Sequence, residues 1–322
     1  MRQFAKPKIV VSKCLEFDAC RYNGEMIPDV TIRNLQPFVT FIPVCPEVEI
    51  GLGTPRETIR IVEENGENRL VQPSTREDVT EKMEQFSNDF LQTISDVDGF
   101  ILKNRSPSCG TRDVKIYSSF EKAPAKGKGP GLFGGAVIKK FSHLPIEEEG
   151  RLSNFIIREH FFTRLFTIAY YKMIKHNKNM KDLVSFQSDN KYLFMAYNQV
   201  KQKELGRIIA NHKNEKIEVV FENYEKTLYE LFMRTPRYTS NVNVCEHIFG
   251  YFKTKLKKQE KDYFLNLIQK YIEKKIPLSS LLAILKSWAL RFDEKYLLRQ
   301  TYFEPYPEAL VEISDSGKGR DY

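Results

Sequence analysis

The sequence has no hydrophobic run that approaches the ~18 residues needed by a membrane-spanning helix. Its first eight residues, MRQFAKPK, lead directly into a strand-like segment without the apolar core of a signal peptide, so we expect a cytoplasmic protein. Cysteine is scarce, with five residues in 322. An odd number of cysteines in a reducing compartment favours metal ligands or reactive thiols over a disulfide framework.

The length of 322 residues favours two domains, and a hydrophobic content of 41% is enough for two cores. Charge is distributed unevenly between the halves. Residues 1–150 hold 20 Lys and Arg against 22 Asp and Glu, a net of −2, whereas residues 151–322 carry a net of +10. This asymmetry predicts a polyanionic partner for the second half, with an ordinary solvated helical surface as the alternative.

The first half is predicted to be an α/β domain with a parallel, Rossmann-like sheet, over residues 1–146. Apolar runs at 8–12, 39–44 and 99–103 are typical of buried strands, and residues 78–95 have helical spacing. Asn65-Gly66 predicts a hairpin turn, and the Gly- and Lys-rich segment 125–135 predicts a loop before a short helix.

The second half, residues 147–322, is predicted to be all-α because strand signals are few there. The expected helices cover residues 147–175, 192–210, 216–233, 244–257, 260–274 and 277–290.

Three cysteines follow, or end, the strand-like runs of the first half. Cys14, Cys45 and Cys109 each lie in a short polar turn. Because parallel strands present ligand sites at their carboxyl ends, we expect the three turns to converge on one crevice. Three thiolates there suit a metal or iron–sulfur site that lacks one protein ligand.

The same turns resemble those of the thiouracil desulfidase (TudS-like) family. The matching blocks are VSKCL at 11–15, RYNG at 21–24, CPEV at 45–48, Gly51 with TPR at 54–56, and LK at 102–103 with SPSCG at 106–110. The resemblance implies an oxygen-sensitive [4Fe-4S] cluster held by Cys14, Cys45 and Cys109, with one iron lacking a protein ligand. It also implies a carboxylate and a serine as catalytic residues, here Glu47 as general acid/base and Ser106 as the residue that orients the attacking water.

Each of these residues has a plainer interpretation. Glu47 could cap a helix or pair with Arg56, Ser106 could be a turn residue, and buried cysteines are often small hydrophobes. For Cys20 we favour a plain core residue, with an approach to the cluster as the alternative, and we take Cys245 as a buried helix residue. Arg21, Asn23 and Arg56 are candidates for substrate or phosphate contacts, with ordinary salt bridges as the alternative.

The second half resembles the YbgA-like domain that is often fused to this desulfidase. The matching blocks are EEGRL at 148–152, KYL at 191–193, LGR at 205–207, NV at 243–244, HIFGYFK at 247–253, QTY at 300–302 and PYP at 305–307. From that family we expect one histidine near Gln187 and another near Tyr197. This chain has a histidine at neither place.

Fused proteins of this kind resemble desulfidases that remove sulfur from 4-thiouridine in tRNA (RudS-like), which implies tRNA as the partner of the basic half. The candidate tRNA contacts are Arg158, Arg164, Lys191, Arg207, Arg234, Arg237, His247 and Lys253.

We therefore expect a [4Fe-4S]-dependent enzyme that converts 4-thiouridine in tRNA to uridine and releases sulfide. Two alternatives stay open at this point. One is a desulfidase for free thiouracil or another small thio-compound, and the other is an RNA-binding protein whose cluster senses redox state without turnover.

Overall fold

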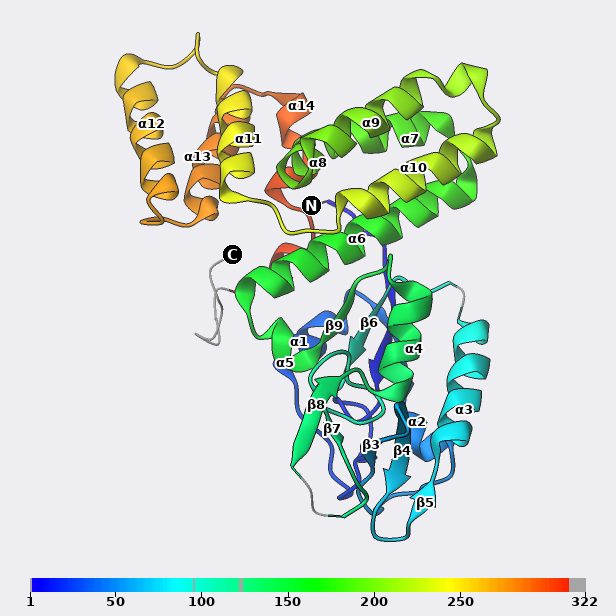
Figure 1. Ribbon diagram of the computed structural model, residues 1–322. Helices are drawn as coiled ribbons and strands as arrows, with labels where there is room; N and C mark the ends of the chain where they lie inside the picture. The colour runs from blue at the N-terminus through cyan, green and yellow to red at the C-terminus, as the bar shows by residue number, and fades with distance from the viewer. Residues whose placement is uncertain (1, 95, 122–123, 313–322) are drawn as a thin grey trace. The chain divides into compact units, whose positions relative to one another are not determined.

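The computed structural model describes residues 2–94, 96–121 and 124–312, and Figure 1 shows the course of the chain. The chain divides into two compact units. The first unit combines Met1–Ala169 with Pro307–Tyr322, and the helical unit comprises Tyr170–Tyr306, so the second is inserted into the first. Within the described ranges, no helix has both the length and the apolar content needed to cross a bilayer.

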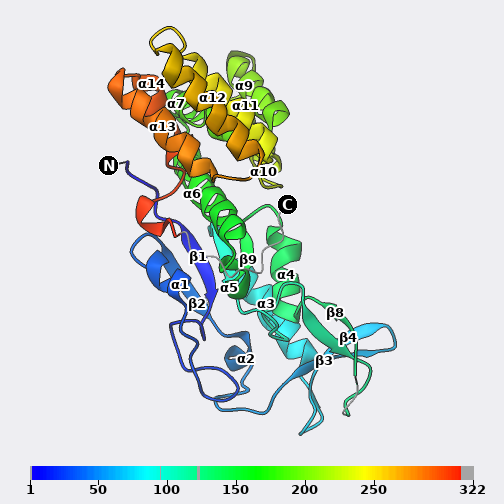
Figure 2. The same cartoon turned by 90° about the vertical axis from the view of Figure 1, so that its left-hand side faces the viewer.

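A four-stranded parallel sheet forms the centre of the first unit, and Figure 2 labels its strands β1, β2 and β9. Its order is β2 (Thr40–Val44), β1 (Lys8–Ser12), β6 (Gly99–Leu102) and β9 (Ile146–Glu148). The three strands predicted from apolar runs are confirmed as β1, β2 and β6. All but the first residue of β1, and all of β6, are buried, as expected for a sheet covered on both faces.

The fourth strand corrects the prediction of one helix over residues 147–175. In β9, Ile146 pairs with Phe100 and Glu148 pairs with Leu102, so this segment completes the sheet. A short helix α5 (Glu149–Leu152) follows, and the long helix α6 (Phe155–Asn177) begins only at Phe155. The predicted boundary between residues 146 and 147 falls inside β9.

A second, mixed sheet has the order β5 (Glu77–Asp78), β4 (Glu67–Gln72), β3 (Arg60–Glu64), β7 (Val114–Tyr117) and β8 (Ala125–Gly129). Strands β3 and β4 form the predicted hairpin, and both turn residues have positive φ, 53° at Asn65 and 85° at Gly66. The loop prediction is wrong for β8. This segment pairs with β7 at the edge of the sheet, where glycines are tolerated because only one side is hydrogen-bonded.

The helices α1 (Val30–Leu35), α2 (Pro46–Glu49), α3 (Thr80–Thr93) and α4 (Leu132–Phe141) complete the first unit, together with the 3₁₀ turn η3 (Glu308–Leu310). The predicted helix at 78–95 is confirmed as α3, although Ser95 lies outside the described residues. Helices α3 and α4 lie side by side, as Figure 1 shows. Their contact brings the Phe86, Phe90 and Phe133 rings within about 6 Å of one another.

The described part of the helical unit contains no strand, as predicted. Its helices are the end of α6, α7 (Met180–Asp189), α8 (Lys191–Tyr197), α9 (Gln199–Ala210), α10 (Ile217–Leu231), α11 (Tyr238–Gly250), α12 (Lys258–Ile272), α13 (Leu278–Arg291) and α14 (Lys295–Leu298), with the 3₁₀ turns η1 (His212–Asn214) and η2 (Thr301–Phe303).

The single helix predicted over residues 192–210 is in fact two helices. Asn198 is extended, with φ −159°, and its side chain accepts hydrogen bonds from the backbone N–H groups of Val200 and Lys201. It therefore ends α8 and caps the start of α9.

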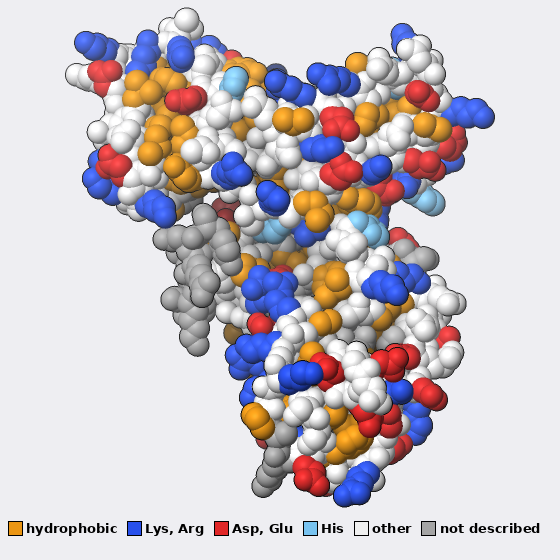
Figure 3. Space-filling model, viewed as in Figure 1, with side chains coloured by type: hydrophobic (Ala, Val, Ile, Leu, Met, Phe, Trp, Pro, Cys, Tyr) orange, Lys and Arg blue, Asp and Glu red, His pale blue; other side chains and the backbone are white. Residues whose placement is uncertain are grey.

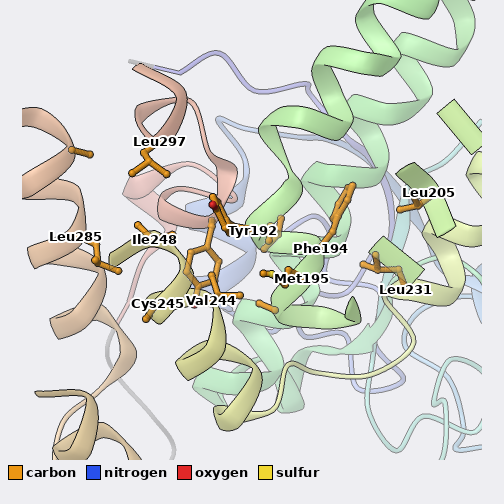
Figure 4. Close-up of a cluster of buried hydrophobic side chains, with 14 of the residues drawn as sticks. Tyr192, Phe194, Met195, Leu205, Leu231, Val244, Cys245, Ile248, Leu285 and Leu297 are labelled. Carbon is orange, nitrogen blue, oxygen red and sulfur yellow. The ribbon is translucent and has the colours of Figure 1, made fainter. Parts of the chain in front are cut away.

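Aromatic and aliphatic side chains from most of these helices form one core, shown in close-up in Figure 4. Cys245 lies in this core beside Val244 and Ile248 and has no exposed surface, as predicted. Trp288 packs against Phe249, Phe252 and Phe264.

Candidate active site

The three predicted ligand cysteines are brought together in one cavity of about 410 Å³, which we call the cysteine cavity. Cys14 follows β1, Cys45 follows β2 and caps α2, and Cys109 lies in the loop after β6. The three strands are adjacent and parallel, so their carboxyl ends meet at the same edge of the sheet. The strand order therefore places the three thiols where they can bind one shared ligand.

Burial sets the chemistry of these thiols. Cys45 and Cys109 are buried, Cys14 is partly exposed, and all three are free of disulfides. Burial and the neighbouring Cys45 raise the pKa of Cys14 to about 12, and burial raises that of Cys109 above its usual range. A cationic metal centre stabilises thiolates in such a place and releases their protons on binding.

Three thiols that line one cavity suit an iron–sulfur cluster. In the described ranges, no group of three His, Cys, Asp or Glu side chains is arranged around one metal ion. In a cluster each thiolate binds a different iron, so the sulfurs need to surround a cavity rather than meet at a point. Cys14, Cys45 and Cys109 would be the residues that hold it.

A hydrogen-bonded chain of side chains connects Glu47 to the loop of Cys109. Glu47 Oε1 accepts a hydrogen bond from Ser108 Oγ at 2.6 Å and a longer one from Ser106 Oγ at 3.4 Å. The two serine hydroxyls are 2.9 Å apart. Ser106 Oγ also accepts the backbone N–H of Cys109 at 3.2 Å. A proton can therefore pass between Ser106 and Glu47 directly or through Ser108.

Arg56 fixes the other oxygen of Glu47. Its Nη2 and Nε lie 2.6 and 2.9 Å from Glu47 Oε2, and its side chain is only 4% exposed. Its Nη1 donates to the carbonyl oxygens of Cys20 at 3.0 Å and Gly53 at 2.8 Å. The alternative in which Glu47 pairs with Arg56 is thus realised, but the pair lines the cysteine cavity and leaves Oε1 facing the serines.

The loop that carries Cys109 is held by the start of α4. The backbone N–H groups of Gly131, Leu132 and Gly134 donate to carbonyl oxygens at Gly110, Pro107 and Ser108, at 2.8 to 3.1 Å. A Cβ on Gly134 would lie 2.5 Å from the carbonyl oxygen of Cys109. The close approach therefore requires glycine at this position.

Two buried glutamates, Glu148 at the end of β9 and Glu149 at the start of α5, hold the same loop. Glu149 pairs with Lys103 Nζ at 2.5 Å and accepts the backbone N–H of Asn104 at 2.7 Å. Glu148 accepts the backbone N–H of Thr111 at 2.6 Å and is 2% exposed. The sequence assigned both carboxylates to the helical half. Nothing in the local pattern linked them to residues more than 35 positions earlier.

The other predicted substrate residues of this unit differ in their placement. Arg21 lines the cysteine cavity and pairs with Glu25 at 3.3 Å. Asn23 is exposed, donates to Glu25 at 2.6 Å, and is not among the residues that line the cavity. Cys20, favoured as an ordinary core residue, is buried and also lines the cavity, where its backbone oxygen lies 3.8 Å from Cys45 Sγ.

The predicted tRNA contacts fall into two groups. Arg158 and Arg164 lie in the part of α6 that belongs to the first unit. Arg158 is a correction: it is 4% exposed, and its guanidinium donates to the carbonyl oxygens of Leu152 and Glu312, so it supports the fold instead of a phosphate. Arg164 is half-buried and donates to the carbonyl oxygen of His143. The contacts predicted in the helical unit are exposed: Lys191, Arg207, Arg234, Arg237, His247 and Lys253.

Comparisons with known proteins match the two halves separately. The 2-thiouracil desulfurase family model matches residues 9–149, and the model of a family of unknown function, DUF1722, matches residues 191–307. The chain is 36% identical over 147 residues to the uncharacterized protein YbbK of Bacillus subtilis, covering 44% of this chain and 95% of YbbK.

A second relative matches over nearly its whole length. The chain is 24% identical over 156 residues to the uncharacterized protein YbgA of Escherichia coli, covering 48% of this chain and 92% of YbgA. Among solved structures, the [4Fe-4S]-dependent thiouracil desulfidase TudS is 28% identical, with a TM-score of 0.36, covering 46% of this chain and 93% of TudS. Through residues 9–149, which contain all three cavity cysteines, the chain belongs to the 2-thiouracil desulfurase family, and it carries a DUF1722 domain in addition.

Proposed function

We propose that the protein is a [4Fe-4S]-dependent hydrolytic desulfidase that converts 4-thiouridine in tRNA to uridine and releases sulfide. The observation that carries this proposal is the meeting, in one cavity, of three free thiols with the Glu47, Ser108 and Ser106 chain. The thiols can bind a soft metal centre, and the carboxylate and hydroxyls can transfer protons to and from water.

Cys14, Cys45 and Cys109 would hold the cluster. When bound, its iron without a protein ligand supplies a Lewis acid with affinity for the sulfur of a thiocarbonyl. The side chains around it perform the hydrolytic part. Ser106 is half-buried and lines the cavity, so its hydroxyl is placed to accept a proton from an attacking water and pass it to Glu47.

Arg56 keeps the proton acceptor oriented. Its two donors occupy Oε2 of Glu47, so only Oε1 is directed at the serines. Lys103, which also lines the cavity, is held by Glu149 and adds a positive charge near the thiols. Lys103 counteracts the raised pKa of Cys14 and favours its thiolate.

The helical unit supports tRNA as the substrate-bearing molecule. Lys191 lies 5.6 Å from the Tyr192 ring, and the hydroxyls of Tyr192 and Tyr251 are 3.2 Å apart. Tyr251 is exposed and stacks on Tyr296 with ring centroids 6.2 Å apart. Figure 3 shows Lys and Arg side chains spread over this unit among hydrophobic ones. Tyr192 itself is buried, so Tyr251 is the exposed ring of this group. Basic side chains and an exposed ring on one unit suit a phosphate backbone and an unstacked base.

A free thiobase is the second candidate substrate, because the family model that matches the first unit is described by 2-thiouracil. The cysteine cavity, at about 410 Å³, has room for a single base. With this substrate the helical unit would take no part in recognition.

One experiment separates these substrates. The full chain is purified without oxygen, its iron and sulfide are counted, and sulfide release is measured with thiolated tRNA and with free thiouracil. Our proposal expects turnover of the tRNA with a steep dependence on salt. Sulfide release from the free base alone would support the free thiobase as the substrate. An intact cluster without any sulfide release would overturn the proposal that the protein is an enzyme.

The ligand assignment has its own test. Cys14→Ala, Cys45→Ala and Cys109→Ala should each remove most of the iron and the visible absorbance, because a cluster held at two corners dissociates readily. Cys245→Ala is the matched control, since Cys245 is buried in the helical core. Equal iron in all four variants would contradict the assignment.

A further inference from the structure

A fourth cysteine lies at the wall of the cysteine cavity. Cys20 is 3% exposed and lines the cavity together with Cys14, Cys45 and Cys109. It is not one of the three residues that would hold the cluster, and the proposed reaction gives it no part. All five cysteines of the chain are free thiols, so Cys20 is available for chemistry of its own.

Cys45 is the neighbour of Cys20 among these thiols. Cys45 Sγ lies 3.8 Å from the backbone oxygen of Cys20. Burial, followed by the neighbouring Cys45 thiol, raises the pKa of Cys20 to about 12, whereas the contribution of Cys14 is smaller. The side chains of Cys20 and Cys45 are therefore close enough to interact, and Cys45 is the partner that Cys20 can reach with the least movement.

One buried guanidinium connects the two segments. Arg56 Nη1 donates to the carbonyl oxygen of Cys20 at 3.0 Å. Arg56 Nη2 pairs at 2.6 Å with Glu47, which lies two residues after Cys45. Because the Arg56 side chain is only 4% exposed, water competes little for these bonds. Bonds between protein groups therefore hold Cys20 beside Cys45.

Cys45 can react with Cys20 only when it is not bound to iron. A thiolate that ligates a metal donates its electron pair to that metal, whereas loss of the metal leaves a thiolate that a peroxide can oxidise. The raised pKa of Cys20 keeps its sulfur protonated, and a protonated thiol reacts slowly with peroxide. Cys20 therefore stays intact while Cys45 is oxidised first.

We propose that Cys20 is a resolving thiol, which forms a reversible disulfide with Cys45 when the protein has lost its cluster and meets a peroxide. In the first step, hydrogen peroxide oxidises the Cys45 thiolate to a sulfenic acid and releases hydroxide. In the second step, the Cys20 sulfur bonds to the Cys45 sulfur, and the sulfenic oxygen leaves as water with the Cys20 proton. A thiolate, a thiol and one peroxide thus give one disulfide, one hydroxide and one water.

The disulfide protects a ligand of the site from further oxidation. Thiol reductants do not restore a sulfinic or sulfonic acid, whereas they reduce a disulfide to two thiols. Reduction therefore returns Cys45 to iron binding. The inference rests on the proposed function for the role of Cys45 as a ligand, and it is independent of the substrate.

The test maps the oxidised thiols in the full chain. Cluster-free protein is prepared with a chelator under anaerobic, reducing conditions, desalted, and treated with a stoichiometric amount of hydrogen peroxide. The remaining thiols are alkylated, and the protein is digested with trypsin and a protease that cuts at glutamate, because Glu16 separates Cys14 from Cys20. We expect mass spectrometry to identify a disulfide between Cys20 and Cys45 as the main product.

A variant without the resolving thiol tests the protection. Cys20→Ser is compared with Cys245→Ser, the matched control, since Cys245 is a buried thiol of the helical core. After peroxide and then dithiothreitol, iron and sulfide are supplied, and the bound iron is counted. Wild type and Cys245→Ser should recover most of the iron that they bind without peroxide. Cys20→Ser should recover several-fold less, because its Cys45 is oxidised beyond the sulfenic acid.

A disulfide that joins Cys45 to Cys14 or Cys109 would overturn the inference, as would the absence of any disulfide of Cys20. Equal iron recovery by Cys20→Ser and wild type would contradict the protection. The mapping uses wild-type protein, so it decides the matter even if Cys20→Ser is unstable. A wild-type protein that forms this disulfide but releases no sulfide from either substrate keeps its resolving thiol, and only the desulfidase proposal fails.

Discussion

Ser108 has no exposed surface and still contacts the two kinds of group that the site requires. Its hydroxyl donates to Glu47 at 2.6 Å and lies 3.7 Å from the sulfur of Cys109. Ser106 is farther from Glu47, at 3.4 Å. Ser108 therefore provides the shorter connection between the carboxylate and the loop, although the sequence indicated only Ser106 as catalytic.

Replacing Ser108 should lower turnover without removing iron. Ser108→Ala deprives Glu47 of its nearest donor, and we expect kcat to fall about 10²-fold, within the usual range for a lost acid–base contribution. Sulfide release is measured alongside iron content. Ser118→Ala, at an exposed position, is the control. If Ser108→Ala keeps full kcat, the proton passes directly between Ser106 and Glu47.

His160 predicts how stability depends on pH. Burial, with a contribution from Arg164, lowers the pKa of His160 from 6.5 to about 3. In the unfolded chain this histidine is protonated below pH 6.5, whereas in the folded protein it stays neutral until near pH 3. The free energy of unfolding therefore falls as the pH drops from 6.5 towards 3.

The matching measurement is urea unfolding between pH 7 and pH 4. His160→Gln removes the titrating group, so its free energy of unfolding should fall less steeply with acid, by ~1 kcal/mol per pH unit relative to wild type. Parallel curves for the two proteins would contradict a buried, neutral His160.

At the scale of elements, the start of α4 packs directly against the loop that carries Cys109. Gly134→Ala would force a methyl group against the carbonyl oxygen of Cys109, so we expect a loss of ~1–3 kcal/mol in unfolding free energy and a lower iron content. Gly135→Ala is the control one residue on, since its methyl would meet only Pro130 at 3.4 Å. It should be neutral or stabilise by up to ~1 kcal/mol. Equal stability of both variants would show that the loop yields easily.

Periodicity predicted the elements whose signal is local. The strands before Cys14, Cys45 and Cys109 are apolar runs, and their parallel pairing explains why their turns meet. Strand β9 was taken for helix because its glutamates are polar. They are buried with partners from elsewhere in the chain, since Glu148 accepts from Thr111 and Glu147 pairs with Arg112. Partners that are distant in sequence do not change the local hydrophobic periodicity, so this pattern could not predict them.

At the scale of the whole molecule, RNA binding should depend on lysines of the helical unit. Lys191→Gln with Lys253→Gln removes two exposed charges near aromatic rings, and we expect weaker tRNA binding with a salt slope reduced by about one to two. Lys178→Gln with Lys275→Gln is the control, because those lysines pair with Glu218 and Glu273. Equal salt slopes for the two pairs would place the RNA elsewhere.

Net charge predicted the basic helical half but concealed a cavity of the first unit that is lined by four cationic side chains. Residues 1–150 sum to −2, yet Arg60, Arg105, Lys115 and Lys128 line one cavity. A sum over a half cannot reveal which charges the fold places together. The sequence offered a pair between Glu47 and Arg56 only as an alternative to a catalytic role, whereas the structure forms this pair at the wall of the cysteine cavity.

The insertion of the helical unit has a consequence for synthesis. The chain leaves the first unit after Ala169 and returns at Pro307, where Arg158 bonds to the carbonyl oxygen of Glu312. As the ribosome extends the polypeptide, the segment with the three cavity cysteines emerges well before Glu312, so this contact forms only after the helical unit has been made. The first unit therefore completes its fold only after the inserted helices have left the ribosome.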